Sequence, residues 1–185
     1  MAPRGYVRLA LPSEARPIAE LQQQAWSDPG HPGHTMAGEL DVDEVAHVWH
    51  RAITRPPLAS YRVLVSVVPA GQQAVGPVEQ VVGFVSVSPS DDPDATDNTG
   101  SVTELVVADS VREDGHRSRL VQAAVDTLKA DGFTMAHWWV PTTDDDLRAE
   151  LVESGWAPDG AHVELQQPDD ESVRVKLVRL HTDIS

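Results

Sequence analysis

The amino-acid sequence predicts one domain with an α/β fold, in which helices pack on a mixed (α+β) sheet. Apolar residues recur every second residue in some segments and every three or four residues in others, as in strands and helices. These segments follow one another in the order β-α-α-β-β-β-α-β-α-β-β. The strand–helix–strand unit in the second half predicts a parallel strand pair, because a crossover helix returns the chain to the same end of the sheet.

Length and composition are those of an ordinary globular protein. The chain has 185 residues, of which 41% are hydrophobic and 23% are charged, and this is enough to bury one core. No long linker or repeat interrupts it, so residues 1–185 are expected to form a single domain. No run of about 18 apolar residues is present, and residues 1–5 lack the apolar segment of a secretory signal. We therefore expect a cytoplasmic protein without a membrane partner.

Charge and cysteine content exclude several kinds of site. The chain has no cysteine, which excludes disulfides, thiolate nucleophiles and thiolate-bound zinc. The formal net charge of −15 argues against a nucleic-acid partner, because such proteins carry a basic surface. The acidic surface either attracts a cationic amine by long-range steering or only keeps the protein in solution.

The first third of the chain is predicted to hold a strand and two helices. Residues 6–11 form a short apolar strand, and Ser13 can cap the helix that follows it. That helix carries apolar side chains on one face and should end near residues 28–30, where the sequence is Asp-Pro-Gly. A second helix is expected over residues 41–53, because its apolar residues also recur at helical spacing and Pro56 follows it.

Three strands and an acidic loop are predicted next. Residues 61–69 and 80–88 form two strands joined by a turn that contains glycine and proline. Residues 89–100 contain four aspartates but lack the glycine and distal glutamate of a calcium-binding EF-hand loop. We therefore predict a solvated hairpin loop there, followed by a strand over residues 101–108.

The last third begins with a helix that has an apolar stripe over residues 120–128 and should end at Gly132. Residues 133–140 are apolar on both faces, which is typical of a strand that is buried on both sides. Thr143 with Asp146 resembles a capping box that opens another helix.

That helix should end at Gly155, and residues 160–166 and 172–181 are predicted to form a terminal hairpin. Its second strand alternates apolar and basic residues, so it is amphipathic. An exposed strand edge can pair with a second copy of the chain, and a homodimer is therefore one alternative for the assembled protein.

Residues 104–117 carry the pattern that is most informative about function. Leu105-Val106-Val107 ends a strand, and Arg112-Glu113-Asp114-Gly115-His116-Arg117 precedes the long helix. The first amide groups of a helix have no intrahelical partner and carry the positive end of the dipole, so they suit a phosphate group. A glycine there lets the backbone approach a ligand closely.

The order of elements and these motifs resemble the GNAT superfamily of acyl-coenzyme A N-acyltransferases, which has a three-layer fold. The phosphate loop of that family reads Arg/Gln-x-x-Gly-x-Gly/Ala, and Arg112 and Gly115 match its first two fixed positions. Arg117 occupies the last Gly/Ala position, and Glu113 and Asp114 stand where glycine and a basic residue are common. Gly155-Trp156 is similar to the Gly-Phe that ends the next helix of the family.

The resemblance implies an N-acetyltransferase that moves an acetyl group from acetyl-CoA directly to an amine of a small molecule or a protein, without a metal. It implies that Glu104 accepts the amine proton through water. The residues implied to bind acetyl-CoA are Leu105, Val106, Val107, Arg112, Glu113, Asp114, Gly115, His116 and Arg117.

Two departures from the family leave alternatives open. Leu151 stands where the family has a tyrosine that protonates the leaving thiolate, so the thiolate leaves unassisted, takes a proton from water or uses a group such as His137. A second alternative is a GNAT-like module that binds a ligand or partner and has lost transfer activity. His31 and His34 lie where the acceptor-binding loop of the family is found, and their surroundings match no recognised metal spacing.

Overall fold

The computed structural model describes residues 5–28, 31, 33–34, 41–70, 79–166 and 174–185. The order of its elements is the order predicted from the sequence. The elements are β1 (Tyr6–Leu9), α1 (Ala15–Trp26), α3 (Val42–Thr54), β2 (Arg62–Pro69), β3 (Glu79–Pro89), β4 (Thr99–Val107), α4 (His116–Ala130), β5 (Met135–Pro141), α5 (Asp145–Glu153), β6 (Ala157–Gln166) and β7 (Arg174–Asp183). The turn expected between residues 166 and 174 lies outside the described residues.

The strands form one seven-stranded sheet in the order β1-β2-β3-β4-β5-β7-β6. Only β4 and β5 pair in parallel, and the other neighbouring strands are antiparallel. The parallel pair predicted from the crossover helix is therefore confirmed. The prediction that the last strand offers an edge is wrong, because β7 inserts between β5 and β6 and pairs with both. The edges of the described sheet are β1 and β6.

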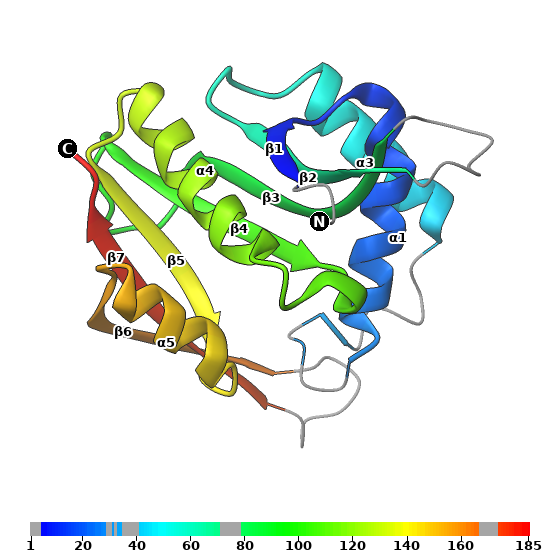
Figure 1. The fold of residues 1–185 in the computed structure, drawn as a ribbon. Coiled ribbons are helices and arrows are strands. Elements are labelled where there is room, and N and C mark those ends of the chain that lie inside the picture. Colours follow the sequence, from blue (N-terminus) through cyan, green and yellow to red (C-terminus); the bar gives the residue numbers. More distant parts are fainter. Residues whose placement is uncertain (1–4, 29–30, 32, 35–40, 71–78, 167–173) are drawn as a thin grey trace.

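Helices cover both faces of the sheet and make a three-layer molecule. Figure 1 shows α4 and α5 on one face and α1 and α3 on the other. The sheet is apolar on both faces, which gives two cores. The core under α4 and α5 contains Leu120, Leu128 and Trp138, and the core under α1 and α3 is built around Ile18 and Phe84. The structure describes no helix long and apolar enough to cross a membrane.

The parallel pair β4–β5 is short, and this opens the sheet. Pairing joins Thr99–Val102 to Met135–Trp138 and goes no further. The register between β3 and β4 shifts just there, so that Thr103 is an extra residue in β4, that is, a β-bulge. A bulge bends its strand and increases the local twist. Beyond Val102, β4 therefore diverges from β5, as Figure 1 shows. No strand in the described part of the chain pairs with residues 103–107 on that side.

Two of the predicted helix starts are wrong, and two predicted helix ends are confirmed. Ser13 lies within a short 3-10 turn before α1, and the N-cap of α1 is Glu14. The cap of α5 is Asp144, whose side chain accepts a hydrogen bond from the Leu147 amide at 3.1 Å, instead of the Thr143–Asp146 pair. The helix begins one residue later than the sequence suggested, so the capping position moves by one. Gly132 and Gly155 follow the ends of α4 and α5 with φ of +93° each.

The acidic loop over residues 89–100 is not simply solvated, because two of its aspartates bind Arg179 of β7. The guanidinium donates to both carboxylate oxygens of Asp94 at 2.6 Å and to Asp92 at 3.2 Å. Its Nε donates to Asp159 of β6 at 2.7 Å. Arg179 is only 6% exposed, so one buried cation ties the loop to the C-terminal hairpin.

Replacing Arg179 with leucine is expected to lower the free energy of unfolding by about 3–5 kcal/mol, because Asp92 and Asp159, whose side chains are only 13% and 19% exposed, would lose the cation that they share. Urea denaturation measures this loss. The control is Arg174→Leu, which removes a comparable but exposed ion pair with Glu164 and should cost about 1 kcal/mol or less. Equal losses in both variants would contradict the structural role of Arg179.

The contribution of Arg179 to the free energy of unfolding should also depend on pH. Hydrogen bonds from Arg179 hold the pKa of Asp94 at about 2, below its ordinary value of 3.8. A carboxylate whose pKa is lowered by folding stabilises the fold above its unfolded pKa and ceases to do so as pH falls through the folded value. The difference between native protein and Arg179→Leu should therefore shrink between about pH 4 and pH 2.

Candidate functional site

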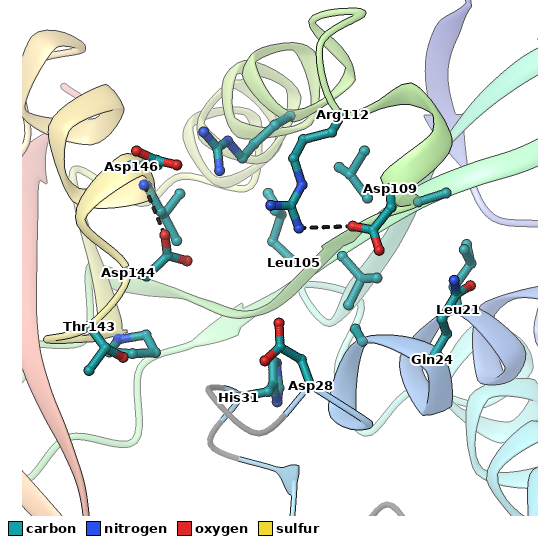
Figure 2. Close-up of a pocket in the computed structure, with 17 residues that line it drawn as sticks. Leu21, Gln24, Asp28, His31, Leu105, Asp109, Arg112, Thr143, Asp144 and Asp146 are labelled. Carbon is teal, nitrogen blue, oxygen red and sulfur yellow. Dashed lines mark hydrogen bonds and ion pairs between the residues drawn. The ribbon is translucent and has the colours of Figure 1, made fainter.

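A cavity of about 370 Å³ lies at the point where β4 diverges from β5. Its walls come from the C-terminal end of α1, residues 105–109 at the end of β4, the start of α4, and residues between Pro141 and Leu147. Figure 2 shows side chains from these separate parts of the chain pointing into one space. The cavity exists because the bulge at Thr103 turns β4 away from its parallel neighbour.

The end of β4 offers backbone groups to this cavity. Leu105, Val106 and Val107, which the resemblance assigned to ligand binding, line the cavity, and their side chains pack in the two cores. Val106 is buried under α1, and Leu105 and Val107 pack against the core on the α4 side. The peptide groups of residues 103–107 that face β5 have no strand partner among the described residues. An extended ligand with amide groups could pair with them as another strand would.

The start of α4 supplies an anion-binding end to the same cavity. Gly115 is the N-cap, with φ of +72° in the left-handed region that side chains disfavour. The first turn of α4 follows at once, so its free amide groups and positive dipole end lie beside the cavity residues Arg112 and Arg117. This arrangement suits a phosphate group.

Both of these arginines have an acidic partner. Arg112 donates to Asp109 at 2.9 Å, and both side chains are exposed. Figure 2 shows this pair at the end of β4. Arg117 donates from Nε to Glu150 of α5 at 2.6 Å, and the pair is largely buried. Arg117 therefore links α4 to α5 while forming part of the cavity wall.

The other predicted loop residues direct their side chains elsewhere. Glu113 and Asp114 are exposed, and neither lines the cavity. His116 is 2% exposed, and its Nδ1 lies 2.7 Å from Ser66 Oγ on β2. Burial lowers the pKa of His116 and favours the neutral ring. His116 therefore anchors the first turn of α4 to the sheet, and only its backbone faces outward to the loop.

Glu104 lies beside the cavity but does not line it. Its carboxylate accepts a hydrogen bond from the indole Nε1 of Trp26 at 3.0 Å. Burial raises the pKa of Glu104, and the Trp26 hydrogen bond partly opposes this. A carboxylate of this kind can take up a proton closer to neutral pH than an exposed one can. Trp26 was missed from the sequence, since no local pattern links two residues so far apart in the chain.

His31 and His34 lie on the α1 side, where the sequence placed the acceptor loop. His31 lines the cavity, and burial lowers its pKa. The Gly33 amide donates to His31 Nδ1 at 3.0 Å, so the neutral ring carries its proton on Nε2. His34 Nδ1 lies 3.2 Å from the Trp26 carbonyl oxygen. Within the described part of the chain, no three His, Cys, Asp or Glu side chains are grouped to hold a metal ion.

The residues considered for the leaving-group proton lie away from the cavity. Leu151 is fully buried in the core under α5. His137 is 8% exposed on β5, and its Nδ1 is 3.3 Å from Asp92 in the loop that Arg179 holds. His137 does not line the cavity, so its hydrogen bond has a structural role.

Comparison with known proteins agrees with the fold of this chain. Residues 66–151 match the model of the acetyltransferase (GNAT) family. An N-acetyltransferase from Staphylococcus aureus Mu50 has the same fold, with a TM-score of 0.74 and 15% identity over 98% of this chain and 99% of that one. A ribosomal-protein-alanine N-acetyltransferase from Brucella melitensis has a TM-score of 0.71 and 16% identity over 96% of this chain and 98% of that one. The protein yncA from Salmonella typhimurium, a putative acetyltransferase solved with its cofactor acetyl-CoA, has a TM-score of 0.70 and 16% identity over 98% of this chain and 94% of that one. No curated protein sequence matches the chain.

Proposed function

We propose that this chain, whose residues 66–151 match the GNAT acetyltransferase family and whose fold is that of solved GNAT proteins, transfers an acetyl group from acetyl-CoA to an amine. The observation that carries the proposal is the cavity between β4 and β5. It places an unpaired strand edge beside the N-terminus of a long helix. The amide-containing arm of coenzyme A matches the first feature, and its pyrophosphate matches the second.

Different residues of the chain would bind different parts of acetyl-CoA. Backbone groups of Leu105 and Val107 would pair with the amides of the extended arm. The amides that follow Gly115 would bind the pyrophosphate, and Arg112 and Arg117 add positive charge to that end of the cavity. Because Arg112 shares its charge only with an exposed aspartate, it can turn toward a phosphate at little cost.

Transfer then needs one proton acceptor. The neutral amine attacks the thioester carbonyl carbon, the new C–N bond forms, and the C–S bond breaks with the electron pair on sulfur. Before the attack, Glu104 accepts one proton from the ammonium group through a water molecule, which gives the neutral amine, and it later returns that proton to solvent. The second proton of the nitrogen passes to water once the C–N bond has formed. The thiolate takes its proton from water, because Leu151 has no proton to donate and His137 is not among the residues that line the cavity. An amide N–H of β4 can polarise the carbonyl during this step.

The acceptor is an amine of a small molecule or a protein. Asp28, Asp144 and Asp146 contribute acidic side chains to the cavity wall away from Arg112. An amine is mostly protonated at neutral pH, and negative side chains would attract it in that form. These residues therefore favour an acceptor that arrives as a cation.

A binding module without transfer activity is the second candidate function. Leu151, at the position of the tyrosine in the resemblance, favours it, and so does Arg117, whose charge is engaged by Glu150 at 2.6 Å. Such a protein would still bind coenzyme A or a related ligand in the same cavity.

Calorimetric titration with acetyl-CoA and with desulfo-coenzyme A tests the proposal. We expect both ligands to bind in the micromolar range, and we expect amines to release free thiol only from acetyl-CoA. Binding without thiol release over a broad panel of mono- and diamines would favour the binding module. The absence of binding at millimolar ligand would contradict both candidate functions.

A further inference from the structure

Trp26, the last residue of α1, joins two parts of the candidate site that are distant in the sequence. Its indole N–H donates to Glu104 Oε1 on β4 at 3.0 Å. Its ring stacks on His31, with 5.8 Å between the centroids and 25° between the planes. Gly33 packs so closely that an added Cβ would lie 2.3 Å from Trp26 Cδ2. One side chain therefore contacts both the proposed base and the loop on the acceptor side of the cavity.

These contacts leave the indole little freedom. The stacked His31 ring and the Gly33 backbone fix the plane of Trp26, and His34 Nδ1 lies 3.2 Å from its carbonyl oxygen. The direction of the N–H bond is then fixed as well. A glutamate side chain has three rotatable bonds, and holding it in one arrangement requires a partner of this kind.

We propose that Trp26 is a positioning residue for Glu104, and that it ties the orientation of this carboxylate to the loop residues His31, Gly33 and His34. The inference rests on the proposed function, because it assigns Trp26 to the base of that reaction. Trp26 would act through Glu104 and not by touching the substrate, since the cavity wall includes His31 but not Trp26.

The surroundings of Glu104 make this hydrogen bond important. On the α1 side, the titratable residues near the C-terminal end of the helix are Asp28, His31 and His34. Asp28 and His31 belong to the cavity wall. On β3, the residue paired with Glu104 is the uncharged Ser86. Among the described residues, no ion pair includes Glu104, and Trp26 is the side chain that donates to it. Burial therefore raises the pKa of Glu104, and the hydrogen bond from Trp26 lowers it.

The test is Trp26→Phe, which keeps an aromatic ring against His31 and Gly33 but removes the N–H donor. The ionised carboxylate would lose its hydrogen bond, so Glu104 would hold its proton to a higher pH. The acid limb of kcat/KM should move to higher pH, and kcat should fall about tenfold because the base is less well oriented. The KM for acetyl-CoA should not change.

Trp49→Phe is the matched control. Trp49 also donates an indole hydrogen bond between helices on the same face of the sheet, to Gln22 Oε1 at 2.7 Å, and it packs against Phe84. Replacing Trp49 with phenylalanine also removes an indole N–H donor, but this donor does not contact Glu104. The control should keep the native pH profile and the native kcat. An equal shift in both variants would overturn the inference.

A second readout does not need activity. The indole N–H resonance of Trp26, identified by its loss in Trp26→Phe, should shift with pH in the native protein and should not shift in Glu104→Gln. If the indole N–H resonance of Trp26 does not shift as Glu104 titrates, the inference is overturned, even if the protein transfers acetyl groups. If the resonance shifts with the titration of Glu104 but the protein transfers no acetyl group, the Trp26–Glu104 pairing is supported and the proposed function is contradicted.

Discussion

A Gly115→Asp variant is expected to bind acetyl-CoA roughly 50- to 300-fold more weakly than the native protein in a calorimetric titration. The substitution acts where the backbone must come closest to the pyrophosphate, at the N-cap of α4. A carboxylate about 6 Å from a phosphate costs roughly 1–2 kcal/mol at an effective dielectric between protein and water. The φ of +72° adds strain for a side chain, and the new charge displaces the ligand from the amides that would hold it.

Gly115→Asn separates charge from shape in this experiment. Asparagine has the size of aspartate, and it is one of the few residues that tolerates the left-handed region. We expect this variant to bind acetyl-CoA about tenfold more weakly than the native protein, and the aspartate variant to bind roughly 5- to 30-fold more weakly still. If the aspartate variant retains the native dissociation constant, the pyrophosphate does not bind at the start of α4.

Glu104→Gln is expected to lower kcat by about 10²–10⁴-fold, which is the usual contribution of a general base. The KM for acetyl-CoA should stay near its native value, because Glu104 does not line the cavity. Burial raises the pKa of Glu104 above the ordinary 4.5, so native kcat/KM should fall with decreasing pH at a pH above that value. A native-like kcat in the glutamine variant would remove Glu104 from the mechanism.

The same substitution should increase stability at neutral pH. A carboxyl group whose pKa is raised by folding binds its proton more tightly in the folded state, so stability falls as pH rises from the unfolded toward the folded pKa. Above that range the protein carries the full cost of a buried carboxylate. Glu104→Gln removes the cost and can still accept from Trp26, so its unfolding temperature should exceed the native one at pH 8. The two should converge near pH 4.

Most of the fold could be predicted from the sequence because each element has a local pattern. The order of strands and helices and the parallel β4–β5 pair follow from periodicity and from the crossover through α4. The position of β7 between β5 and β6 could not be predicted, because both orders of a terminal hairpin bury the same alternating residues. The cap of α5 is Asp144 and not Thr143, and the sequence could not separate the two because either side chain can accept a hydrogen bond from a first-turn amide.

The site could be predicted only where it is local. Leu105, Val107 and Arg112 line the cavity, and their spacing is a property of one strand and one loop. The two contacts that organise the rest join distant residues, Trp26 with Glu104 and Arg179 with the acidic loop. Side chains of these types occur on many surfaces, and their spacing in the chain contains no information about the contact. Both were therefore beyond what a single sequence can indicate.

The divergence of β4 from β5 has a further consequence for how this protein avoids aggregation. A strand with unpaired amide and carbonyl groups is a template to which any extended segment of another chain can add. Most proteins have such edges at the margins of a sheet, but here the open stretch over residues 103–107 lies in its middle. The cavity beside this stretch is walled by α1, the start of α4 and residues 141–147, and we expect these neighbours to obstruct the addition of a second strand with its side chains. Polymerisation through this edge is thereby restricted, and the same peptide groups stay available to a small ligand.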